Sequence, residues 1–221
     1  MNQSRTNQPE ALNHPLPTAP YLEQAAQWPA QGKHVLAHYD DDSIIVYQAY
    51  KPGIGDYAVR HGRLGGPEFG FSRMSWIKPN FLWMMYRCGW ATKVNQERVL
   101  ALRLRRSFFD AWLVQAVPSS FGAARQAYAS RDAWANAVTS SEVRLQWDPD
   151  HHPSGAKLTR RAVQLGLRGS ALRDLADAAL LEVIDMTDFV IGQRPFTRDG
   201  SPHLLTPVEH VYPSPLSDPH E

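Results

Sequence analysis

The sequence predicts an α+β fold in which two small, mostly antiparallel sheets form a cleft, with flanking helices and a carboxy-terminal packing helix. Four separate segments have the composition of strands. Their β-branched, aromatic and leucine residues alternate with polar ones, as in half-buried strands. These strand segments are residues 43–50, 98–106, 143–147 and 160–168. Apolar residues with helical spacing over 172–184 predict the packing helix, with Ser170 as its cap.

The length and composition allow one domain with a substantial core, since 43% of the 221 residues are hydrophobic. We expect a weakly ordered tail over residues 1–30, a globular domain over 31–192 and a proline-rich tail over 193–221. The single cysteine excludes an intrachain disulfide, and no apolar run approaches the ~20 residues that cross a bilayer. No signal peptide is visible, so we expect a cytoplasmic protein with no membrane partner.

Charge is unevenly distributed, although the formal net charge is only +1. Residues 51–106 contain eleven Lys and Arg against three Asp and Glu, whereas residues 174–221 contain two against nine. The middle of the chain therefore has a positive field suited to an anionic ligand. Alternatively, the two regions neutralise each other across the fold.

The first clear strand, residues 43–50, places Gln48 on the same face as Ile44 and Val46. A buried amide needs hydrogen-bond partners, so Gln48 is either paired in the core or lies at the floor of a pocket. Residues 54–64 follow as a predicted helix, and the glycines at 62–66 predict a turn.

Residues 73–90 are the densest stretch of unusual residues, with three of the seven tryptophans. Lys78 precedes a proline, so residues 71–77 are expected to be extended. Pro79 can begin a helix that Gly89 ends. A plain core helix does not need so many polar groups, so we interpret the stretch as one wall of a ligand site. The polar and aromatic candidates in it are Arg73, Trp76, Lys78, Asn80, Trp83 and Arg87.

Later segments offer fewer candidates. Ser119 or Ser120 can cap a helix over residues 123–128, and Ser130 another over 134–138. Residues 148–153, Asp-Pro-Asp-His-His-Pro, predict a rigid turn. Asp and His packed so closely could bind a hydrolytic metal ion. Neighbouring side chains rarely converge on one ion, however, and we expect no metal.

Four motifs resemble the family known as domain of unknown function 4291, over roughly residues 30–190. They are Val46-Tyr47-Gln48-Ala49-Tyr50, the 73–90 stretch, Gln146-Trp147-Asp148-Pro149 and Gln164-Leu165-Gly166-Leu167-Arg168. The order of elements is also similar to small ADP-ribosyltransferase-like domains, which hold NAD in a cleft between two sheets. That resemblance implies Gln48 or Tyr47 at the first catalytic position, Ser75 or Trp76 at the second, and Gln146 or Gln164 at the third.

The resulting hypothesis is a nucleotide-binding protein, with NAD as a possible cofactor and ADP-ribosyl transfer as a possible reaction. Gln48 and Gln164 are the catalytic candidates. Cationic side chains of the 73–90 stretch would bind phosphates, and its tryptophans would stack on a base. Tyr47 and Tyr50 would orient the ribose or nicotinamide. The alternative hypothesis is a module that binds single-stranded nucleic acid without catalysis. The site hypothesis requires Gln48, Arg73, Lys78 and Gln164 to converge on one pocket.

Overall fold

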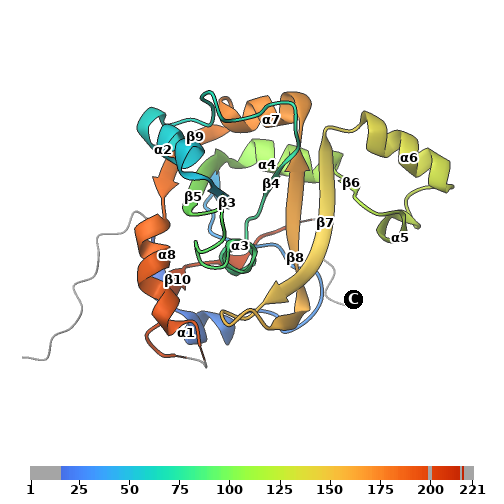
Figure 1. The fold of residues 1–221 in the computed structure, drawn as a ribbon. Coiled ribbons are helices and arrows are strands. Elements are labelled where there is room, and N and C mark those ends of the chain that lie inside the picture. The colour runs from blue at the N-terminus through green and yellow to red at the C-terminus, as the bar shows by residue number, and fades with distance from the viewer. Residues whose placement is uncertain (1–15, 199–200, 215, 217–221) are drawn as a thin grey trace, which may run out of the picture.

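Two open sheets form the body of the protein, in a computed structural model that describes residues 16–198, 201–214 and 216 (Figure 1). The first has the order β3 (Ser43–Tyr50), β5 (Arg98–Arg105), β9 (Leu180–Asp185). The second has the order β4 (Ser75–Ile77), β8 (Lys157–Leu167), β7 (Val143–His151), β6 (Val117–Pro118). Every pairing in them is antiparallel except β6 with β7. The predicted α+β class is confirmed.

Eight α-helices occur in the described residues. They are α1 (Tyr21–Ala25), α2 (Pro52–His61), α3 (Phe81–Cys88), α4 (Arg106–Gln115), α5 (Phe121–Ala124), α6 (Arg131–Ser140), α7 (Gly169–Ala176) and α8 (Thr187–Gln193). In Figure 1, α3 lies between the two sheets, whereas α5 and α6 lie at one side, beyond β7. Ser120 and Ser130 cap α5 and α6 through their hydroxyls, as predicted. No helix of the described chain is long and apolar enough to cross a membrane.

Strand β3 separates two hydrophobic cores because its side chains alternate between faces. Ile44 and Val46 belong to one core, which α4 and α7 cover. Ile45 and Tyr47 belong to the other, together with Phe81 of α3. Gln48 continues the face of Ile44 and Val46, but it lies where the two sheets diverge.

Within the residues that the structure describes, one backbone bridge joins the two main sheets. The Tyr47 N–H donates to the carbonyl of Lys78 at 2.7 Å, and the Lys78 N–H donates back at 3.3 Å. Lys78 is therefore extended, as its position before Pro79 predicts. Beyond this bridge, β3 and β4 separate.

The predicted carboxy-terminal helix over residues 172–184 is wrong in its second half. Helix α7 ends at Ala176, and residues 180–185 form strand β9, which pairs with β5. Leucine, valine and isoleucine suit a strand as well as a helix, and the free edge of β5 decides between them. Ser170 is not the cap either, because α7 begins at Gly169 and Arg168 occupies the N-cap position; the Glu142 carboxylate accepts the Ser170 N–H at 3.0 Å.

The predicted turn over residues 148–153 is also wrong, because β7 continues to His151. Three short strands lie in the segments that we assigned to tails. Strand β1 (Thr18–Pro20) pairs with β10 (Leu205–Pro207), and β2 (Leu36–Ala37) pairs with β11 (His210–Val211). These strands are only two or three residues long, too short for an alternating pattern to show in the sequence. Residues 1–15 and 217–221 of the expected tails lie outside the described residues.

Glu209 ties the carboxy-terminal segment to the start of α3. Its buried carboxylate accepts the N–H of Phe81 at 2.7 Å and the amide of Asn80 at 3.3 Å. Trp28 donates its indole N–H to the Glu209 carbonyl at 2.9 Å. Burial holds the pKa of Glu209 well above its usual range, despite the N–H of Phe81.

Glu209 should therefore make stability depend on pH. A raised folded-state pKa contributes stability that is complete below the usual carboxyl pKa of about 4.3 and is lost as the pH rises through the folded-state value. We expect Glu209→Gln, which cannot ionise, to become more stable relative to the wild type as the pH rises. Urea unfolding of both proteins, at a series of pH values from about 4.3 upward, measures the difference in the free energy of unfolding.

The control is Glu23→Gln, which removes an exposed carboxylate from α1. Glu209→Ala also leaves the N–H of Phe81 unpaired, which should lower the free energy of unfolding by about 1–3 kcal/mol. Parallel pH curves for the wild type and Glu209→Gln would contradict the assignment.

Candidate functional site

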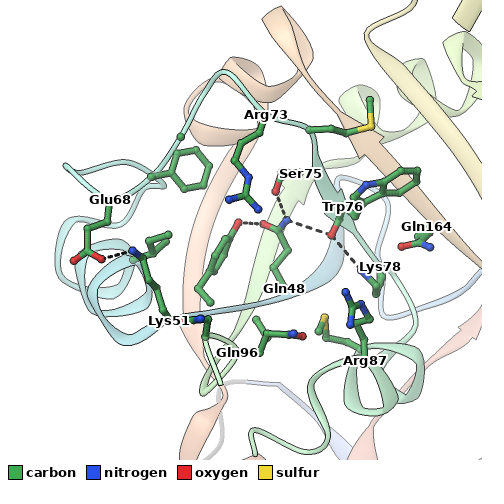
Figure 2. A pocket seen from close by; sticks show the side chains of 18 of the residues that line it. Gln48, Lys51, Glu68, Arg73, Ser75, Trp76, Lys78, Arg87, Gln96 and Gln164 are labelled. Atoms are coloured by element: carbon green, nitrogen blue, oxygen red, sulfur yellow. Dashed lines mark hydrogen bonds and ion pairs between the residues drawn. The ribbon is translucent and has the colours of Figure 1, made fainter. Parts of the chain in front are cut away.

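A cavity of about 760 Å³ lies where the two sheets diverge. Its walls come from β3, β4, the loop after α2, α3, and one glutamine each of β7 and β8. Gln48, Arg73, Lys78 and Gln164 all line it, so the four residues of the site hypothesis converge (Figure 2). Its volume is in the range of small-molecule and cofactor sites.

Lys78 contributes a buried amine to this cavity. The residue is 4% exposed, and its Nζ donates to the Trp76 carbonyl at 3.3 Å. No carboxylate of the described residues forms an ion pair with it. Burial and the nearby Arg87 lower the pKa of Lys78 to about 8, although Asp148 acts in the opposite direction. A buried cation without a paired carboxylate is suited to an anionic ligand.

Two arginines add positive charge. Arg73 and Arg87 line the cavity and are exposed, and neither guanidinium makes a hydrogen bond or ion pair within the described part of the chain. Lys51 also lines the cavity, but it pairs with Glu68 at 2.6 Å. Arg73, Lys78 and Arg87 are therefore the cations available to a ligand.

Gln48 connects β3 with β4 at the centre of the site (Figure 2). Its Nε2 donates to the Ser75 hydroxyl at 2.7 Å and to the Trp76 carbonyl at 3.3 Å. Its Oε1 accepts from the Tyr50 hydroxyl. Burial raises the pKa of Tyr50, although Ser75 and Arg73 act against this. The hydroxyl is therefore a neutral hydrogen-bonding group at neutral pH.

Two amides held by a carboxylate form the opposite side of the cavity. Gln146 and Gln164 are register partners on β7 and β8, and each donates to Asp148 at 2.8 Å. Both glutamines line the cavity, whereas Asp148 does not. The carboxylate thus fixes the two amides. The Gln146 carbonyl oxygen accepts from the Ser119 hydroxyl at 3.3 Å, whereas the Gln164 carbonyl oxygen is left as an acceptor for a ligand.

Trp76 lies against a glycine of the neighbouring strand. It pairs with Gly166 of β8, where a Cβ atom would be 2.6 Å from Met74 Sδ and 3.0 Å from the Trp76 ring. The absence of a Cβ atom at Gly166 therefore leaves room for Met74 and Trp76, both of which line the cavity.

Three predicted ligand-binding residues do not line the cavity. Tyr47 is fully buried and packs edge-on against Phe81, because it faces the opposite side of β3 from Gln48. Asn80 caps α3, with its Oδ1 accepting the Trp83 N–H at 2.7 Å. Trp83 is buried and stacks on His151. These three residues support the site's walls.

The Asp148–His152 segment does not converge on an ion. Asp150 forms a buried ion pair with Arg160 at 2.6 Å, and the His151 ring stacks against the rings of Tyr86 and Trp83. Among the described residues, no group of three Asp, Glu, His or Cys side chains could hold a metal.

Residues from loops complete the cavity and were missed by the sequence reasoning. They are Lys51, Glu68, Phe69, Asn95 and Gln96. The glycines before Glu68 indicated a turn after the predicted helix over 54–64, but they did not indicate that the following loop would line the cavity. Only the excess of positive charge over residues 51–106 pointed toward this region.

Comparison with known proteins gives a family and no activity. No curated protein matches the chain in sequence. One family model matches residues 34–212, which include both main sheets and every residue that lines the cavity. The chain therefore belongs to the family described as Domain of unknown function (DUF4291).

Proposed function

We propose that the cavity binds a nucleotide through its phosphates, with NAD as the first ligand to test. The observation that carries the proposal is the buried Lys78 amine, which has no carboxylate partner in the described residues and lies beside Arg87. Phosphate oxygens would supply the missing negative charge through charge-assisted hydrogen bonds.

The arrangement of groups suggests how a nucleotide would lie. Lys78 and Arg87 are together at one end, whereas Arg73 is near Tyr50 (Figure 2). Phosphates fit the first end. The Tyr50 hydroxyl, whose proton is donated to Gln48, and the Gln164 carbonyl would accept hydrogen bonds from a sugar, and Phe69 and Trp76 would offer aromatic surface to a base.

The geometry supports binding better than ADP-ribosyl transfer. Gln48 and Gln164, the catalytic candidates, are neutral amides whose nitrogens are already engaged. Stabilising a ribosyl cation calls for a negative charge. Asp148 would supply it only if Gln146 and Gln164 moved aside, because they line the cavity and it does not.

The alternative, a surface for single-stranded nucleic acid, has less support. Such surfaces need exposed aromatic rings along an open basic groove. Of the tryptophans in residues 73–90, Trp83 and Trp90 are buried and only Trp76 lines the cavity.

Binding can be measured by calorimetry against NAD, ADP-ribose and mononucleotides. Lys78→Met should weaken the affinity about tenfold to a hundredfold, since a hydrogen bond to a charged group is worth about 1.5–3 kcal/mol. Lys157→Met, at an exposed position of β8 outside the cavity, is the matched control. If none of these ligands binds at millimolar concentration, the proposal fails.

Affinity for phosphates should also depend on pH. The Lys78 pKa of about 8 means that the amine loses its charge as the pH rises through this value. Nucleotide affinity should therefore fall across that range in the wild type. Lys78→Arg, which stays charged, should show a flatter profile. Identical profiles for the two proteins would show that the Lys78 charge does not contribute to binding.

A further inference from the structure

The surroundings of the Lys78 amine bear on its reactivity as well as on its charge. Its amine is inside a cavity, its hydrogen bond is to a backbone carbonyl, and no described carboxylate holds it as an ammonium ion. The backbone on either side is fixed, by the bridge to Tyr47 and by Pro79. A nucleophilic amine needs the same features, namely a fixed position, partial desolvation and a neighbouring cation.

We propose that Lys78 is a nucleophile that forms an imine with an aldehyde or ketone bearing a phosphate group. This inference goes beyond nucleotide binding, because it concerns a covalent step and a ligand class defined by its carbonyl group. Arg87, beside Lys78, would bind the phosphate and hold the carbonyl carbon near Nζ.

The step is balanced without an oxidant or a reductant. The neutral amine of Lys78 attacks the carbonyl carbon, so that a C–N bond forms, the C=O π bond breaks and one of the two amine protons moves to the oxygen. The resulting carbinolamine loses its hydroxyl together with the one proton that remains on nitrogen, as water, and a C=N bond remains. A hydrolytic reversal returns both reactants.

Two properties separate Lys78 from the other cavity lysine. At pH 7 about a tenth of an amine with the Lys78 pKa of about 8 is neutral, against less than about a thousandth for an ordinary lysine. Lys51, in contrast, is partly exposed and paired with Glu68. Reaction at low aldehyde concentration should therefore select Lys78.

Pyridoxal phosphate, which combines an aldehyde with a phosphate, is a suitable probe. The full chain is incubated with it, and borohydride then reduces any imine to a stable secondary amine. Intact mass spectrometry should show one principal adduct, and peptide mapping should place it on Lys78. Pyridoxal, which lacks the phosphate, should label that site at least tenfold less.

Variants test the assignment further. Lys78→Arg keeps the charge but cannot form the imine, so it should lose the adduct, whereas Lys51→Met should keep it. Arg87→Met should reduce labelling by pyridoxal phosphate more than labelling by pyridoxal. The wild-type peptide map does not depend on whether a variant folds.

The inference is overturned if the adduct maps to other lysines, or if Lys78→Arg is labelled as fully as the wild type. Labelling of Lys78 in a protein that binds no nucleotide would support the imine while refuting the nucleotide proposal. The two failures are therefore distinguishable.

Discussion

The bridge between Tyr47 and Lys78 is the constraint on which the site depends. Its two backbone hydrogen bonds link the three-stranded sheet to the four-stranded sheet. Because β3 and β4 diverge beyond it, side chains from both sheets face one cavity. The same bridge directs the Tyr47 side chain into the core and leaves the Lys78 amine in the cavity.

Helix α3, which forms another wall of the cavity, is positioned by a segment far away in the sequence. Glu209 accepts the first N–H of α3, and Asn80 caps the same helix, so the carboxy-terminal segment fixes where α3 begins. Arg87 is on the last turn of that helix and borders the cavity. A segment with no cavity-lining residue therefore still determines the placement of a cationic one.

The sequence predicted what local rules control. The strand over residues 43–50 follows from its composition, the extended Lys78 from Pro79, and the end of α3 from Gly89, which has positive φ. It did not predict β9, whose apolar residues suit a helix until β5 offers a partner. Successive side chains of a strand point to opposite faces, so only one of two adjacent candidates in β3 could line the cavity. Gln48 faces the cavity, whereas its neighbour Tyr47 faces the core.

Fold stability alone does not account for Lys78. Burying an ammonium group without a carboxylate costs free energy, and an apolar side chain of similar length would pack at the same place without that cost. The polar groups around it do not remove the cost, since its described hydrogen bond is to one backbone carbonyl and Arg87 repels its charge. A ligand anion would offset the charge, and an imine would remove it. Both proposals therefore address the same energetic conflict, and they differ in whether the amine binds as a cation or reacts as a neutral nucleophile.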